Sequence, residues 1–173
     1  MKYATTPETS ELTGLSVETL REWTKRRALI PADIPPRSKG SPAQYAWQTV
    51  LILRLAVSLR NRFHLELQAH KTLFAELKEF LRRSRPSDLK ESTLVLFGDG
   101  RWTLVNDAGR GQIEEEALFI RLKAYLEPLL VAFGLADDLP FLQIELFPME
   151  SFATKRKDPI RTEDHELSCE VVA

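Results

Sequence analysis

The segment 6–27 constrains the fold more than any other part of the chain. Its pattern predicts a short helix over residues 6–12, a tight turn at Gly14 and a second helix over residues 16–27. Glycine takes the positive φ that such a turn requires without steric cost. The hydroxyl of Ser16 is suited to cap the second helix. Two helices joined in this way predict a helix-turn-helix, whose second helix can enter the major groove of DNA.

The second predicted helix has one apolar face and one polar face. At spacings of three and four, Val17, Leu20 and Thr24 share the face expected to pack inward. The side chains at its start are placed for base edges, because hydroxyls, carboxylates and methyl groups each have partners there. We therefore expect DNA contacts from the start of the helix and from its polar face, with Arg21 on a phosphate: Ser16, Val17, Glu18, Thr19, Arg21 and Lys25.

The segment 32–46 is predicted to form a wing beside these helices. Four prolines in and next to it forbid a helix, and residues 37–41 have the composition of a turn. Two short strands, near residues 33–35 and 43–45, would close the wing. Arg37 and Lys39 at its tip could then reach the phosphate backbone. The alternative is a surface loop with two incidental cations.

Four motifs in the first half of the chain resemble the N-terminal DNA-binding domain of the MerR family of bacterial transcription regulators. The resemblance covers roughly residues 3–75 and continues into a long apolar helix. Its motifs are Thr13-Gly14-Leu15-Ser16, Thr19-Leu20-Arg21-Glu22-Trp23, Leu29-Ile30-Pro31 and Gln44-Tyr45. The resemblance implies a winged helix-turn-helix that binds promoter DNA as a homodimer and distorts the spacer between promoter elements, with RNA polymerase as a possible partner.

The resemblance also implies roles for individual residues. Arg21 occupies the position of the family's Thr-Leu-Arg arginine, Trp23 the position of an aromatic ring beside the backbone, and Tyr45 the tyrosine that ends the wing. Three positions depart from the family. Arg27 replaces a glycine that ends the helix in a left-handed conformation, Ala43 replaces a wing arginine and Ala46 replaces a capping serine. In this comparison Arg37 and Lys39 would supply the missing wing charge.

The remainder of the chain predicts an α+β fold that is mainly helical. Helices are expected over residues 47–62 and 65–83, and a β-hairpin over residues 93–105 around Asp99-Gly100. A helix over residues 112–134, kinked or split at Pro128, and a third strand over residues 142–146 should follow. The predicted domains are a winged helix at 1–85, a small acidic dimerisation or sensing domain at 91–147 and a disordered tail at 148–173.

Helix 112–134, together with the hairpin, is predicted to form the dimer contact or the pocket that gates it. Its apolar arc is wider than one hairpin can comfortably cover, and an uncovered arc marks an interface. The alternative is that the hairpin and strand 142–146 cover the arc in a compact monomeric domain. The residues of the arc are Leu118, Phe119, Leu122, Tyr125, Leu126, Leu129, Leu130 and Phe133.

Charge divides the chain into two halves. Residues 1–90 contain 16 Lys and Arg against 9 Asp and Glu, whereas residues 91–173 contain 8 against 16. This asymmetry indicates that the first half faces nucleic acid and that the second half has another task. The alternative is two ordinary solvated surfaces that happen to differ.

Several classes of protein are disfavoured. One cysteine, Cys169, and three scattered histidines predict neither a disulfide nor a metal site, and no cofactor is expected. The chain contains no signal peptide and no apolar run of about 18 residues, so a cytoplasmic location away from membranes is expected. Neither a phosphate loop nor a nucleophile motif indicates an enzyme.

Three functions stay open on the sequence. The first is a sequence-specific transcription regulator of the MerR type. The second is an architectural DNA-binding factor, such as a phage or plasmid excision or partition protein, whose sequence would look much the same. The third is a sensing or interaction protein whose winged helix binds a partner protein.

Overall fold

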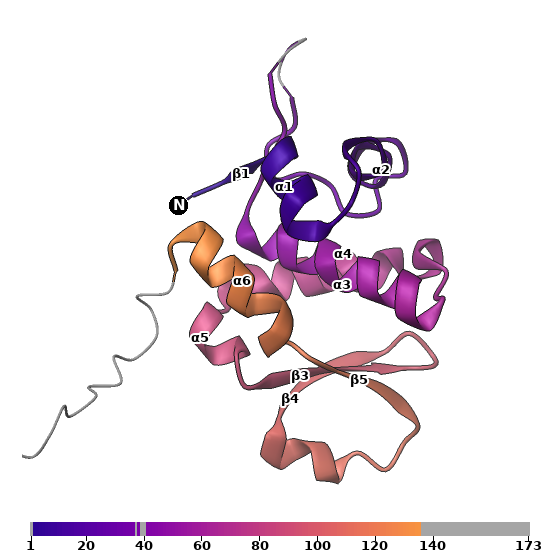
Figure 1. Ribbon diagram of the computed structural model, residues 1–173. Helices are drawn as coiled ribbons and strands as arrows, with labels where there is room; N and C mark the ends of the chain where they lie inside the picture. Colours follow the sequence, from indigo (N-terminus) through magenta and orange to yellow (C-terminus); the bar gives the residue numbers. More distant parts are fainter. Residues whose placement is uncertain (1, 37, 39–40, 136–173) are drawn as a thin grey trace, which may run out of the picture. The chain divides into compact units, whose positions relative to one another are not determined.

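The structure is a computed structural model that describes residues 2–36, 38 and 41–135, and it is α+β and mainly helical (Figure 1). All of these residues belong to one compact unit. The elements in chain order are β1 (Ala4–Thr5), α1 (Thr6–Thr13), α2 (Val17–Arg21), the π-helical turn η1 (Glu22–Arg26), β2 (Gln44–Tyr45), α3 (Trp47–Phe63), the 3₁₀ turn η2 (Leu67–His70), α4 (Lys71–Arg83), α5 (Pro86–Leu89), β3 (Ser92–Phe97), β4 (Trp102–Asn106), the 3₁₀ turn η3 (Asp107–Gln112), β5 (Ala117–Arg121) and α6 (Lys123–Phe133).

Local capping signals define the first two helices. Thr5 caps α1, where its backbone N–H and its hydroxyl donate to the Glu8 carboxylate at 2.7 and 2.8 Å. These hydrogen bonds hold the pKa of Glu8 below its usual range. The helix ends at Gly14, whose φ is 73°. Ser16 then caps α2, because its hydroxyl accepts from the Thr19 N–H at 3.1 Å. The predicted pair of helices around a glycine turn is confirmed.

The second helix is not the continuous α-helix that the sequence predicts over residues 16–27. α2 ends at Arg21 and continues as η1, in which the Arg27 N–H donates to the Glu22 carbonyl at 2.8 Å. This wider turn leaves both Trp23 and Thr24 buried. The left-handed residue is Ala28, with φ of 46°, one position after Arg27, which keeps a right-handed conformation.

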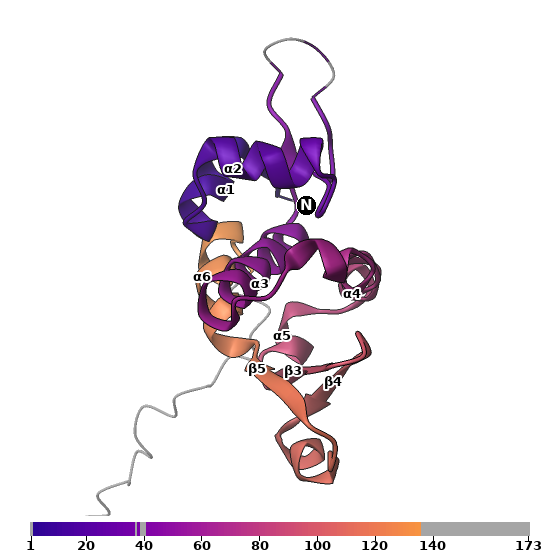
Figure 2. The ribbon, with the colours of Figure 1, turned by 90° about the vertical axis from the view of Figure 1, so that its right-hand side faces the viewer.

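The segment between η1 and β2 is closed at its base. Ile34 and Gln44 form an antiparallel bridge, and β2 pairs with β1. The two arms, residues 31–36 and 41–45, lie side by side (Figure 2). The bridge falls where the sequence predicts two short closing strands.

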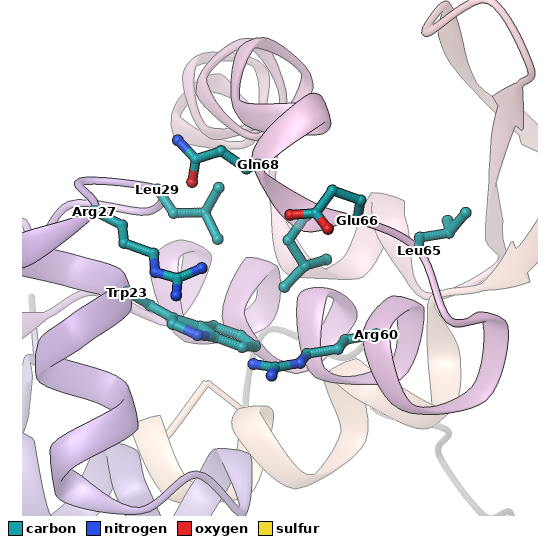
Figure 3. A pocket seen from close by; sticks show the side chains of 8 residues that line it. Trp23, Arg27, Leu29, Arg60, Leu65, Glu66 and Gln68 are labelled. Atoms are coloured by element: carbon teal, nitrogen blue, oxygen red, sulfur yellow. The ribbon is translucent and has the colours of Figure 1, made fainter.

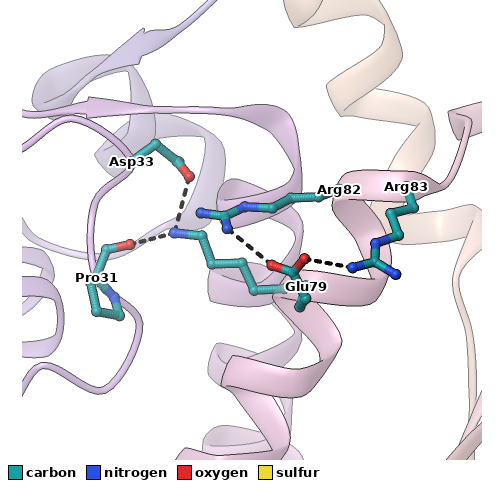
Figure 4. A network of polar contacts seen from close by, with 6 residues as sticks. Pro31, Asp33, Glu79, Arg82 and Arg83 are labelled. Carbon is teal, nitrogen blue, oxygen red and sulfur yellow. Dashed lines mark hydrogen bonds and ion pairs between the residues drawn. The ribbon is translucent and has the colours of Figure 1, made fainter.

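An aspartate from this segment binds the backbone at the start of α3. The Asp33 carboxylate accepts from the Ala46 N–H at 2.8 Å, at the start of α3. Lys78 of α4 lies 3.0 Å from the other oxygen of Asp33 and also donates to the Pro31 carbonyl at 2.7 Å (Figure 4). The base of the segment is therefore tied to both α3 and α4.

Helix α3 is the central element of the core. It contacts α1, α4 and α6, and between Trp47 and Leu59 only Arg54 and Val57 are not fully buried. The predicted helix over residues 65–83 begins later, because η2 occupies Leu67–His70 and α4 starts at Lys71.

A three-stranded antiparallel sheet follows, with β3 between β4 and β5. The β3–β4 hairpin confirms the prediction around Asp99-Gly100. The first half of the predicted helix 112–134 is wrong, because residues 117–121 form β5 and pair with β3. Ile120 is buried whereas Phe119 and Arg121 are exposed, which is the alternation of a half-buried strand. The predicted third strand at 142–146 lies outside the described residues.

Helix α6 contributes the second half of the predicted helix. Pro128 lies inside it without splitting it, and Gly134 ends it with φ of 66°. The predicted arc is divided between β5 and α6. Its α6 residues Leu126, Leu129 and Phe133 are at most 5 % exposed, whereas Phe119 on β5 is 36 % exposed. The buried α6 residues therefore offer no uncovered apolar surface for an interface.

The hydrophobic core is continuous across the part of the chain that the structure describes. One cluster of buried side chains includes Leu51 and Leu55 of α3, Leu77 of α4, Leu94 of β3 and Leu126 of α6. It therefore contains residues from both sides of the predicted division at 85. The predicted tail, 148–173, lies outside the described residues, as does Cys169.

Candidate nucleic-acid interface

The start of α2 presents a small polar surface. Ser16 and Glu18 are exposed, and Val17 and Thr19 are half-buried. The hydroxyls of Ser16 and Thr19 lie 2.8 Å apart and share a hydrogen bond. Since Ser16 is occupied in capping the helix, Glu18 is the acceptor best placed to meet a donor from outside the protein.

Cations follow on the outward side of α2 and η1. Arg21, Lys25 and Arg26 are exposed, and within the described part of the chain none of them has an ion-pair partner. Arg27, by contrast, lies 2.7 Å from Glu22. Cations that are not neutralised by the protein can pair with phosphates and release the counterions bound to them. This surface is therefore suited to a polyanion.

A recess separates this helix from the 31–45 segment. It has a volume of about 400 Å³, and Arg21, Thr24 and Lys25 line one side of it. The other side is mostly proline, from Pro31, Pro35, Pro36 and Pro42. The predicted tip cations Arg37 and Lys39 lie outside the described residues. The recess thus places Arg21 and Lys25 opposite a proline-rich segment, whose backbone is conformationally restricted.

Two predicted contact residues are buried. Trp23 is 2 % exposed and Tyr45 is 1 % exposed. The Tyr45 hydroxyl lies 3.4 Å from the Thr24 hydroxyl, and both are in the interior. Both side chains therefore pack in the core, and a direct DNA contact from either of them stays a prediction.

Two arginines, Arg27 and Arg60, lie beside the Trp23 ring (Figure 3). The guanidinium carbon of Arg60 lies 5.7 Å from the ring centroid, within cation–π range. Figure 3 shows Arg27 and Arg60 on this ring, in a pocket of about 150 Å³ that Glu66 and Gln68 also line. No sequence pattern indicates this role for Arg60, since it lies on α3, far from the helix-turn-helix in the chain.

Other classes of site are not found in the described ranges. No helix there is long and apolar enough to cross a membrane. Among the residues whose positions are given, no group of three His, Cys, Asp or Glu could hold a metal ion.

The comparisons with known proteins agree with this geometry. Residues 5–77 match the family model described as MerR HTH family regulatory protein. No curated protein matches the chain. The matched segment begins at β1 and ends within α4, so it includes α1, α2, the 31–45 segment and α3.

Proposed function

We propose that this protein, whose residues 5–77 are a MerR-family helix-turn-helix domain, regulates transcription by binding specific promoter DNA as a homodimer. The observation that carries the proposal is the outward side of α2 and η1. There Arg21, Lys25 and Arg26 are exposed with no ion-pair partner in the described part of the chain. This unneutralised surface lies within the segment that the family model matches.

The contacts divide into two kinds. Glu18 and Thr19 at the start of α2 read base edges, because a carboxylate accepts from cytosine N4 and a hydroxyl pairs with either base of a pair. Arg21 and Lys25 hold phosphates and set the orientation of the helix. Ser16 and Val17 support the same end of the helix.

The 31–45 segment acts as a wing. The Ile34–Gln44 bridge and the Asp33–Lys78 ion pair hold its base against the helical core. The recess of about 400 Å³ between it and α2 would receive a phosphate strand. Arg37 and Lys39 would extend the positive surface along that strand.

The proposal of a homodimer rests on how little DNA one domain can cover. A single helix-turn-helix covers few base pairs, and two half-sites one helical turn apart require a two-fold dimer. RNA polymerase is the expected partner at the promoter, in the cytoplasm. Light scattering of the full chain at micromolar concentration should give the mass of a dimer, and a monomer that stays monomeric on a two-half-site duplex would contradict this part.

The test of sequence-specific binding is selection from genomic DNA. Fragments captured by the full chain are sequenced, and the enriched motif is measured by fluorescence anisotropy against a shuffled duplex. Specific binding should exceed binding to the shuffled duplex by 10³-fold or more at physiological salt. Binding that is equal on both duplexes would support the architectural reading instead.

A double variant tests the base-reading residues. Glu18→Gln with Thr19→Ala should enrich a different motif, with each lost contact worth about 1–3 kcal/mol. Glu11→Gln, an exposed change on α1, is the matched control and should leave the motif unchanged. An unchanged motif in the double variant would show that these residues do not read bases.

A further inference from the structure

A groove between the helix-turn-helix and α6 contains a cation that the DNA-binding surface does not use. Arg54 of α3 donates from Nη1 to the Leu12 carbonyl at 2.7 Å. Its Nε is buried and has no hydrogen-bond partner among the residues that the structure describes. A guanidinium has five N–H donors, so most of the hydrogen-bonding capacity of Arg54 is unused. Burial lowers the pKa of Arg54, although an arginine stays charged at neutral pH.

The groove beside Arg54 is large enough for a small molecule. Its volume is about 480 Å³, within the range of about 300–1,000 Å³ that small-molecule sites occupy. Arg54 and Arg62 line it together with hydroxyl and amide side chains, and no carboxylate is among its lining residues. The Tyr125 hydroxyl donates to Ser58 at 2.7 Å, which joins α6 to α3, and both residues line the groove. The groove is therefore positive and has hydrogen-bonded side chains in its wall.

Apolar surface completes the walls. Leu12, Val57 and Ala124 line the same groove, and the Tyr125 ring lies beside them. A ligand that matches these walls has one anionic group for the guanidinium and an apolar body. A guanidinium can hold either a carboxylate or a phosphate in a bidentate pair. A carboxylate fits this partly apolar groove better, because the second negative charge of a phosphate ester would cost more to desolvate.

We propose that this groove binds a small apolar carboxylate, with its anionic group on Arg54 and its body against Leu12, Val57 and Ala124. Arg62, which is exposed at the rim, adds to the positive potential. The site lies outside the surface that is proposed to bind DNA.

The position of the site gives it a regulatory role, which rests on the proposed DNA binding. Thr13 and Gly14, the turn between α1 and α2, form part of the groove wall, and Ala124 and Tyr125 of α6 form the opposite part. A bound carboxylate would hold the turn against α6 and so change how α2 is presented. Coupling between two sites typically changes affinity by about 5–150-fold.

The binding step is tested on the full-length chain without DNA. Benzoate is titrated while the ¹⁵N-labelled side-chain Nε–H of Arg54 and the amides of Gly14 and Ala124 are followed by NMR. Benzyl alcohol supplies the same body without charge, and inorganic phosphate supplies charge without the body. Benzoate should move all three signals with saturation and bind at least tenfold more tightly than either comparator. Equal binding of benzyl alcohol or phosphate, or no response of Arg54, would overturn the site.

Two matched variants locate the site without altering Arg54. Ala124→Phe places a ring in the groove from an exposed position of α6, and Val131→Phe places one on the same helix at a position that is 76 % exposed. Ala124→Phe should weaken benzoate binding at least tenfold, whereas Val131→Phe should leave it unchanged. Unchanged binding in Ala124→Phe would overturn the assignment.

Regulation is measured separately. Anisotropy on the selected duplex, with and without saturating benzoate, should show a change in DNA affinity of about fivefold or more. If benzoate binds by NMR and the DNA affinity stays the same, the site stands and its regulatory role is overturned. If no duplex is bound specifically, the proposed function fails while the NMR result still decides the site.

Discussion

The Lys78 ammonium lies 3.0 Å from the Asp33 carboxylate, and the two side chains are only 13 % and 14 % exposed (Figure 4). The same carboxylate accepts from the Ala46 N–H at 2.8 Å. One side chain thus joins the 31–45 segment both to the start of α3 and to α4. These contacts connect residues that are 13 and 45 positions apart in the chain.

Removal of either charge of this pair should strongly destabilise the protein. Asp33→Asn or Lys78→Met leaves a largely buried partner unpaired, which costs about 3 kcal/mol. The double variant should lose less than the sum of the two single variants, because both act on one interaction. Urea unfolding measures all three. Glu79→Gln is the control, since its pairs with Arg82 and Arg83 are exposed and worth at most about 1 kcal/mol. Additive losses would contradict the coupling.

Ala28→Gly should stabilise the protein. Ala28 has φ of 46°, and a left-handed conformation costs a residue with a Cβ about 1–2 kcal/mol. Glycine removes that strain but adds about 0.4–1 kcal/mol of freedom to the unfolded chain, so a net gain of about 0.5 kcal/mol is expected. Chemical unfolding measures it. Ala75→Gly, at an exposed position inside α4, should instead destabilise by about 1 kcal/mol. A loss for both variants would rule out strain at Ala28.

Glu8→Gln should change how stability depends on pH. The Thr5 backbone N–H and hydroxyl donate to Glu8 and lower its pKa in the folded protein. A lowered pKa means that the folded state binds its proton less tightly than the unfolded state, whose pKa is about 4.3. The stabilisation by Glu8 is therefore complete above that pKa and is lost as pH falls through the lowered folded value.

The expected difference between the wild type and Glu8→Gln is about 0.5–1 kcal/mol at pH 7, the usual value of a capping interaction. It should shrink steadily below about pH 5. Urea unfolding at pH 7, 5 and 3 measures it, with Glu11→Gln on the same helix as the control. A difference that stays constant with pH would show that the Glu8 charge does not stabilise the cap.

Arg21→Ala should weaken binding to every DNA sequence and leave the fold intact, because Arg21 is exposed and makes no ion pair in the described ranges. The slope of log affinity against log salt should fall by about 1, the loss of one phosphate contact. Arg121→Ala removes the same charge from the exposed side of β5 and should leave the slope unchanged. Equal slopes for the two variants would remove α2 from the interface.

Local sequence signals account for the parts of the fold that were predicted. Ser16 and Gly14 act through hydrogen bonds and backbone angles within a few residues, so their roles are visible in the sequence. The hairpin at Asp99-Gly100 is equally local. In contrast, the Ala46 N–H donates to Asp33, which pairs with Lys78, and nothing within one turn of Ala46 indicates either residue.

Strand β5 shows why the sequence alone does not identify residues 117–121 as a strand. Residues 117–121 form a short apolar run, which periodicity alone does not assign to a helix or a strand. Pairing with β3 decides it, since a partner distant in sequence satisfies its backbone groups. The candidate site divides in the same way. The exposure of Arg21 and Lys25 follows from helix periodicity, whereas the burial of Trp23 and the approach of Arg54 to Leu12 depend on tertiary packing.

The central position of α3 determines what a shortened chain would do. α3 packs against α1 and α4 on some sides and against α6 on another, where Ser58 meets Tyr125. A fragment that ends near residue 85 would keep the first contacts and lose the last, which turns interior methyl groups into solvent-facing surface. Such a fragment would tend to self-associate through a surface that is buried in the intact protein. Self-association of the fragment would therefore reflect the truncation, and the natural oligomeric state has to be measured on the whole chain.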